Sequence, residues 1–290
     1  MENIQETKNN HWVAITHQKK FISEIDGLLH YATIDEYKKI WLTNNEKRGF
    51  PCYYRNNVEE KIYDQTSEDH LANNIDYHYN NSVDLINQRA INCNIDKNNL
   101  LQIINLFLYG VKLVERNPRT YKNIKGLVEK EKEDEEGLNK FICDFEDKIG
   151  FKLPPFDYVN SLKNALNPKE IYNKTLIKEI KEYMGGPAFN QFFKDKIWVF
   201  LHNTTNIPFI ISCNPVIINQ GEIKVGFPMT KNIYFAVFQP ESDNYFIHHL
   251  DFNNIDKINE LNMEQVNRFK RDGKYLMGGE NEEFLKKLLK

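Results

Sequence analysis

Residues 198–216 constrain the fold more than any other part of the chain. Two apolar, β-rich runs at 198–201 and 209–211 flank a polar stretch at 202–206, and this pattern is typical of a β-hairpin. The second run leads into Ser212-Cys213-Asn214-Pro215. There the proline favours extended geometry before it, and the short polar side chains can bond to their own backbone. The sequence therefore predicts a hairpin whose second strand stops at a polar turn.

The spacing of apolar residues changes along the chain, and this change predicts the fold class. Helical spacing begins near residue 57 and is strongest at 100–114, in a helix that we expect to end before Pro118. Period-two spacing then dominates, before a helix at 253–270, a short apolar run at 275–277 and a terminal helix from 282. The predicted strands are 196–202, 207–212, 222–226, 232–238 and 244–249. We expect an α+β fold with a mixed or antiparallel sheet, built from N- and C-terminal segments, and a central helical bundle.

The predicted organisation is one domain at 11–290 behind a disordered tail at 1–10. N-terminal strands are expected within 11–55, with an Asp-Gly turn at 26–27. A helical region at 56–187 includes a helix at 168–184, and the region 188–290 forms most of the sheet.

Charge and cysteine content exclude several classes of protein. The 290 residues carry a formal net charge of −3 and a pI of about 6.3, so the chain as a whole does not attract nucleic acid electrostatically. Its four cysteines form no Cys-x-x-Cys pair, which favours a reduced, cytoplasmic protein. We expect neither a secretory signal nor a membrane span. Small basic clusters remain as local candidates for binding nucleic acid, namely 19–20, 38–39, 268–271 and 286–287.

Four blocks of sequence resemble an uncharacterised bacterial family catalogued as domain of unknown function 4238. They are Asn10-His11-Trp12-Val13-Ala14 with Phe21, Arg116-Asn117-Pro118, the segment 208–216, and Phe227-Pro228-Met229-Thr230. The blocks occur in the family's order over most of the chain. The resemblance implies a shared fold and an effector of the defence or toxin type. The family has Asp where this chain has Cys213, which implies a lost or altered activity if that Asp is functional.

The predicted site combines polar residues from distant parts of the chain. His11 would transfer protons and Arg116 would hold a phosphate or carboxylate, with Ser212 and Asn214 positioning the substrate. The other candidates are Glu59 or Glu60 as a carboxylate, Arg119 for substrate binding and Cys213 as a nucleophile. Structural roles compete with each of these: Arg116 as a helix cap, His11 in the core, Asn214 as a turn former and Cys213 as an inert buried thiol.

These residues favour a hydrolytic effector that acts on phosphodiester or nucleotide substrates. The alternatives are a non-catalytic ligand-binding or sensor protein and a thiol enzyme that uses Cys213. No pattern typical of a zinc site or a phosphate-binding loop occurs, so no metal ligands are predicted. The cofactor stays unassigned, with a divalent metal ion as an open hypothesis. Nucleotides or nucleic acid are the expected partners, and no membrane is expected.

Overall fold

A computed structural model describes the protein over residues 9–11, 13–35, 37–51, 53–55, 65–91, 97–116, 118–149, 157–177, 182, 196–220, 222–239, 247–272 and 274–290. Residues 1–8 of the predicted tail lie outside this description. Asn9 and Asn10, also assigned to the tail, instead form strand β1 (Asn9–His11), which pairs antiparallel with β4 (Tyr53–Arg55).

The N-terminal segment contributes strands, as predicted, but the turn of their hairpin lies at 35–39 and not at the Asp-Gly turn at 26–27. Strands β2 (His30–Ile34) and β3 (Ile40–Asn44) pair antiparallel around a turn at Asp35. Short helices precede and follow them: α1 (Ile15–Gln18), η1 (Lys19–Phe21) and α2 (Asn45–Arg48). Gly27 has the left-handed φ of +73° that the Asp-Gly turn predicted.

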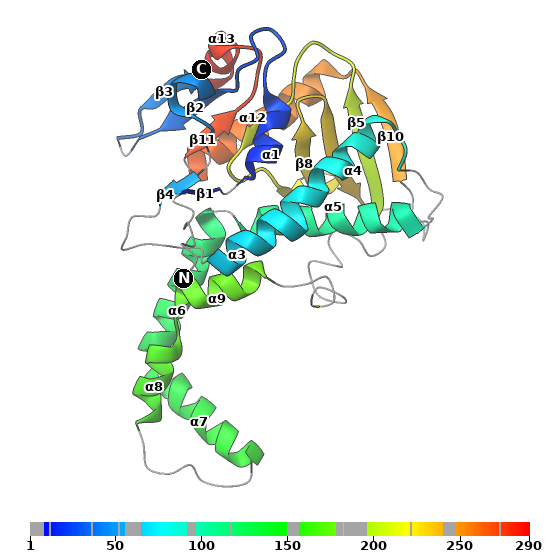
Figure 1. Cartoon of the computed structure of the whole chain (residues 1–290). Helices are drawn as coiled ribbons and strands as arrows, with labels where there is room; N and C mark the ends of the chain where they lie inside the picture. Colours follow the sequence, from blue (N-terminus) through cyan, green and yellow to red (C-terminus); the bar gives the residue numbers. More distant parts are fainter. Residues whose placement is uncertain are drawn as a thin grey trace, which may run out of the picture.

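The central region is helical, as expected. Its elements are α3 (Gln65–His70), the π-helix η2 (Leu71–Asp76), α4 (Tyr77–Asn87), α5 (Lys97–Glu115), α6 (Pro118–Glu133), α7 (Glu135–Ile149), α8 (Tyr158–Ala165) and α9 (Pro168–Leu176). Helix α5 ends before Pro118, which then starts α6 at a position where a missing N–H costs nothing. Helices α4 and α5 run beside the sheets, whereas α6, α7 and α8 extend away from them (Figure 1). None of the described helices is long and apolar enough to cross a membrane.

The C-terminal strands belong to two different sheets, so the predicted 198–212 hairpin is wrong. Strand β5 (Ile197–Asn203) lies in a five-stranded sheet of order β10-β5-β9-β8-β7, with β7 (Ile217–Gln220), β8 (Ile223–Thr230), β9 (Ile233–Phe238) and β10 (Ile247–Phe252). Strand β6 (Ile211–Ser212) pairs instead with β11 (Tyr275–Met277) in a four-stranded sheet of order β3-β2-β11-β6. Side chains of 203–207 bond to their own loop, which carries the chain from one sheet to the other.

The four-stranded sheet confirms that both ends of the chain share one sheet. Strands β2 and β3 come from the first fifty residues, and β11 comes from the last twenty. The α+β class is likewise confirmed, with mixed pairing, because β5 and β10 are parallel while β5 and β9 are antiparallel.

Alternating side chains of the five-stranded sheet pack on two helical layers. Trp198 and Phe200 face the core formed with α4 and α5, whereas Val199 and Leu201 face α12 (Ile255–Asp272). The first half of α12 covers this sheet, and its second half covers the four-stranded sheet beside α13 (Glu282–Leu289). One helix therefore joins the two sheets through opposite ends of its apolar face.

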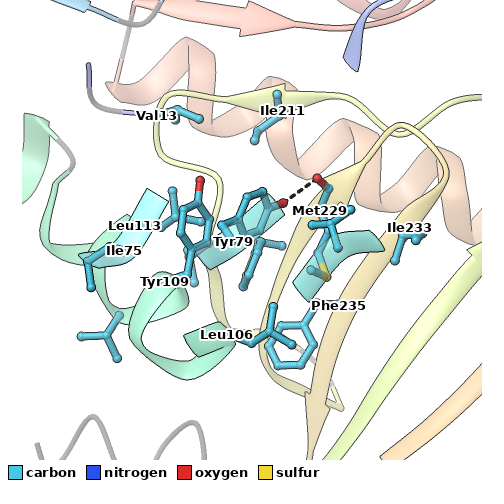
Figure 2. Close-up of a cluster of buried hydrophobic side chains, with 14 of the residues drawn as sticks. Val13, Ile75, Tyr79, Leu106, Tyr109, Leu113, Ile211, Met229, Ile233 and Phe235 are labelled. Atoms are coloured by element: carbon cyan, nitrogen blue, oxygen red, sulfur yellow. Dashed lines mark hydrogen bonds between the residues drawn. The ribbon is translucent and has the colours of Figure 1, made fainter. Parts of the chain in front are cut away.

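A polar network lies inside the core between α4, α5 and β8. The rings of Tyr79 and Tyr109 stack with their centroids 3.8 Å apart, and Tyr79 donates to the Met229 carbonyl at 2.7 Å (Figure 2). Tyr109 donates to His17 Nδ1 at 2.8 Å, and His17 Nε2 donates to the Pro228 carbonyl at 2.9 Å. These bonds satisfy groups that have no access to solvent, so we assign the network a structural role.

Candidate functional site

Arg116, predicted to hold a phosphate, lies in a buried ion pair. Its Nη1 atom donates to both carboxylate oxygens of Asp76, at 2.9 and 3.0 Å, and its side chain is 2% exposed. Asp76 belongs to η2, so the pair ties the end of α5 to the π-helical turn before α4. This geometry does not support the predicted substrate-binding role.

The polar turn after β6 is docked on α12. The backbone N–H and the hydroxyl of Ser212 both donate to Gln265 Oε1, at 3.1 and 2.9 Å. The Asn214 carbonyl accepts from Arg268 at 3.5 Å. Both Ser212 and Asn214 are buried, so their contacts fix the turn to the helix and do not support substrate positioning.

Cys213 is 6% exposed and is disulfide-bonded. A sulfur in a disulfide carries no thiolate, so the structure contradicts the predicted nucleophile. It also corrects the expectation that the cysteines are all reduced. The described free cysteine is Cys143, which lies exposed on α7.

The remaining predicted residues are described in part or not at all. His11 ends β1 opposite Tyr53, and its side chain lies outside the description. Arg119 lies in the first turn of α6, also without a described side chain. Glu59 and its alternative Glu60 fall outside the described residues.

A different set of polar side chains meets at one end of the five-stranded sheet. The parallel register places His202 of β5 beside Asp251 of β10, and Phe200 beside His249. Residues at alternate positions share a face, so His202, His249 and Asp251 all project toward the α4 side. Arg89, just after α4, forms an ion pair with Asp251. We call Arg89, His202, His249 and Asp251 the histidine site.

A chain of hydrogen bonds sets the protonation of the two imidazoles. His249 Nε2 lies 2.5 Å from the Ile91 carbonyl, which can only accept, so this nitrogen carries a proton. His249 Nδ1 then accepts from His202 Nε2 at 2.8 Å. In the neutral form the open nitrogen of His202 is therefore Nδ1, and it bonds to none of the residues that the structure describes. His249 thus orients His202 as a hydrogen-bond acceptor or base.

Both imidazoles are neutral at physiological pH. Burial, followed by the neighbouring His249 and Arg89, lowers the pKa of His202 to about 4, although Asp251 acts in the opposite direction. Burial also lowers the pKa of His249. The hydrogen bond to the Ile91 carbonyl raises this pKa, and the charge of Arg89 lowers it. A bound anion would stabilise the imidazolium form and raise both pKa values again.

Arg89 occupies a strained backbone position. The Ala90 N–H bonds to the Leu85 carbonyl and the Arg89 N–H to the Ile86 carbonyl, which is the Schellman arrangement at the end of a helix. This motif needs a left-handed residue and usually has glycine there, whereas Arg89 adopts a φ of +53°. Backbone strain at a side chain that reaches a polar cluster points to a functional use of that side chain.

We expect Arg89→Gly to be about 1 kcal/mol more stable than Arg89→Ala, because only the alanine keeps the Cβ atom that opposes a left-handed φ. Both variants lose the guanidinium, so the exposed ion pair cancels from the comparison. Urea unfolding of the two variants measures the difference. Equal free energies of unfolding would show that the position carries no backbone strain.

This site could not be predicted from the sequence, because its residues meet only through strand pairing. The sequence predicts that His202 starts the polar stretch of a hairpin, and His248 and His249 are strand neighbours, which point to opposite faces and cannot pair with each other. That geometric rule holds here, as His248 is exposed. The partner of His249 is instead His202 of β5, and the local sequence does not show that β5 pairs with β10.

The histidine site offers two imidazoles, one guanidinium and one carboxylate, half-exposed to exposed. Nowhere in the described part of the chain do three or more His, Cys, Asp or Glu side chains form a group suited to a metal ion. The arrangement instead suits an anionic ligand that Arg89 attracts and His202 contacts through Nδ1. Comparison of the chain with models of known families, with curated proteins and with solved structures found no match in any of the three, so the interpretation of this site rests on its geometry.

Proposed function

We propose that the protein hydrolyses phosphodiester or nucleotide substrates at the histidine site. The observation that carries the proposal is the hydrogen-bond chain from the Ile91 carbonyl through His249 to His202. This chain orients the His202 ring and leaves its Nδ1 atom unprotonated. Arg89 would hold the phosphate of the substrate. The negative charge of that phosphate would raise the pKa of His202 from about 4 toward the working pH.

In the proposed step, His202 Nδ1 takes a proton from the attacking water. The water oxygen forms a bond to phosphorus, the bond to the leaving oxygen breaks, and the leaving oxygen receives a proton from solvent. His249 is a positioning residue, because its Nδ1 atom accepts a hydrogen bond from His202 Nε2 and so holds the His202 ring. Asp251 orients Arg89 from the neighbouring strand position.

The test compares wild type, His202→Gln and His248→Gln on single-stranded RNA, DNA and nucleotides, with and without Mg²⁺ or Mn²⁺. His202→Gln is expected to lose at least 100-fold in kcat/KM, which is the lower range for general base catalysis. His248→Gln is the matched control, because it makes the same substitution at the residue before His249, whose side chain is exposed. Absence of turnover in wild type under every condition, or full turnover by His202→Gln, would refute the proposal.

A second function, ligand binding without catalysis, is favoured by one observation. A pKa of about 4 makes His202 a weak base, and weak bases accept protons poorly at neutral pH. Under this alternative, a nucleotide or inorganic phosphate raises the melting temperature of wild type, that shift disappears in Arg89→Gly, and no turnover occurs. The same ligand screen therefore separates a sensor or binding protein from a hydrolase.

Three further expectations from the sequence stay predictions. They are membership of the domain of unknown function 4238 family with its effector role, a cytoplasmic location, and nucleotides or nucleic acid as partners. The disulfide at Cys213 weighs against a reducing compartment, since disulfides are uncommon there. A fractionation experiment with an antibody to the protein would decide the location.

A further inference from the structure

The tip of the β2–β3 hairpin displays aromatic side chains to solvent. Tyr37 is 83% exposed and Trp41 is 46% exposed, whereas most aromatic residues of the described chain lie in the core. Two exposed aromatic side chains gathered at one tip form a candidate interaction surface.

The tip is held rigidly by one carboxylate. Asp35 accepts hydrogen bonds from the backbone N–H groups of Tyr37 and Lys39, both at the turn, and from the indole N–H of Trp41, at 3.0, 2.8 and 3.0 Å. All three bonds are made within the hairpin tip. Lys38 completes the turn with a left-handed φ of 63°. The turn backbone and the Trp41 ring are thus held in a fixed arrangement, which reduces the entropy lost on binding.

Basic residues lie in and near the hairpin tip. Lys38 and Lys39 lie in the turn, and Lys39 Nζ lies 4.0 Å from the centre of the Trp41 ring. Pairing of β11 with β2 brings the second basic segment to the same end of the sheet, because the Ile34 N–H bonds to the Lys274 carbonyl. Arg271 is three residues before Lys274, so their Cα atoms are within about 11 Å.

This juxtaposition joins two basic clusters that are more than 200 residues apart in sequence. The sequence of segments 34–41 and 270–275 contains five cationic residues, Lys38, Lys39, Lys270, Arg271 and Lys274, and three acidic residues, Asp35, Glu36 and Asp272. The local charge is therefore positive although the whole chain has a net charge of −3. We call Tyr37, Lys38, Lys39, Trp41 and Lys274 the hairpin-tip surface.

We propose that the hairpin-tip surface binds single-stranded nucleic acid. Tyr37 stacks on an unpaired base, Trp41 contributes a second ring face, and the lysines contact the phosphates on either side. A rigid aromatic platform within a basic rim is the combination that proteins use for single strands without strict sequence preference. A base-paired duplex offers no free base face, so it binds through the lysines alone. The inference concerns binding and does not depend on the proposed hydrolysis.

Fluorescence anisotropy tests the proposal with labelled single-stranded DNA and RNA of about 20 nucleotides, longer than the usual site. The measurements use full-length His202→Gln protein in EDTA, so that cleavage does not interfere. We expect Tyr37→Ala to raise Kd roughly 5- to 150-fold for single strands, the range for loss of one stacked base, and to leave duplex binding unchanged. Trp41→Phe, which keeps a ring, is expected to retain most of the affinity.

A lysine pair variant gives a second, independent measurement. Lys38→Gln/Lys39→Gln should reduce the slope of log Kd against log salt by about 1.4, since each lost phosphate contact on a single strand removes about 0.7. The matched control is Lys286→Gln/Lys287→Gln on α13, which makes the same change in charge on another element and should leave Kd unchanged.

Three outcomes would overturn the inference. The first is an unchanged Kd for Tyr37→Ala in protein whose unfolding curve matches wild type. The second is an equal effect of the two lysine pairs. The third is binding of poly-L-glutamate as tightly as the oligonucleotide, which would indicate an acidic protein partner. Catalytic failure of the histidine site would leave all three results unaffected.

Discussion

Replacement of Asp76 by Asn is expected to lower the free energy of unfolding by about 3–5 kcal/mol, the usual cost of removing one partner from a buried ion pair. Arg116 would keep its charge while its side chain stays 2% exposed, without the Asp76 carboxylate that compensates for the water it has lost. The pair lies between η2 and the end of α5, so its loss loosens the junction on which the helical region rests. Urea unfolding followed by tryptophan fluorescence measures the change.

The control for this variant is Asp84→Asn on the adjacent helix α4. Asp84 pairs with Lys20 at 3.6 Å, and its side chain is 62% exposed. Exposed pairs contribute about 0–1 kcal/mol, so this variant should be nearly as stable as wild type. Asp76→Leu combined with Arg116→Met should recover part of the stability lost by Asp76→Asn, because the double change leaves no unpaired charge. Equal losses for Asp76→Asn and Asp84→Asn would refute the prediction.

Acidification is expected to destabilise the protein through His17. The neutral ring is bonded on both sides, to Tyr109 and to the Pro228 carbonyl, and burial lowers its pKa from 6.5 to about 3. Below pH 6.5 the unfolded chain therefore binds a proton that the folded protein does not. The free energy of unfolding should fall by about 1.4 kcal/mol per pH unit, or about 2 kcal/mol between pH 6.5 and pH 5.

Other groups modify this dependence in known directions. His202 and His249 also have lowered pKa values, so their protonation destabilises the folded state in the same direction, although they are half-exposed. Asp76 acts oppositely, because burial raises its pKa and lets the folded protein bind a proton more readily at acidic pH. The slope near neutral pH is thus dominated by the fully buried His17.

The slope is measured from urea unfolding curves between pH 7 and pH 5. His17→Gln, whose amide can replace both hydrogen bonds, should be less stable at pH 7 but should lose most of the pH dependence. His248→Gln serves as the control, because its side chain is exposed on β10. If His17→Gln keeps the wild-type slope, groups other than His17 cause the pH dependence and the prediction is wrong.

Several elements were predictable from local sequence alone. The helix that ends before Pro118 and the two C-terminal helices follow from apolar spacing and from helix-breaking residues, and the short apolar run between those two helices forms strand Tyr275–Met277. These signals are local, because the period of the hydrophobic pattern and the constraint that proline places on the residue before it operate within a few positions. The sharing of one sheet by both chain ends followed from the same alternation of strands and helices.

Strand partners and the histidine site required the tertiary structure. Phe209–Ile211 has the composition of a strand, but composition does not identify the neighbour, and the pairing of β6 with β11 spans more than sixty residues. His202 and His249 become a pair only because β10 lies parallel to β5 in one particular register, and a shift of one residue would turn His249 to the opposite face. Sequence by itself determined where most helices and several strands lie, since that depends on local periodicity. Packing of the two sheets around α12 decided which side chains meet, because buried area is optimised over contacts between distant parts of the chain.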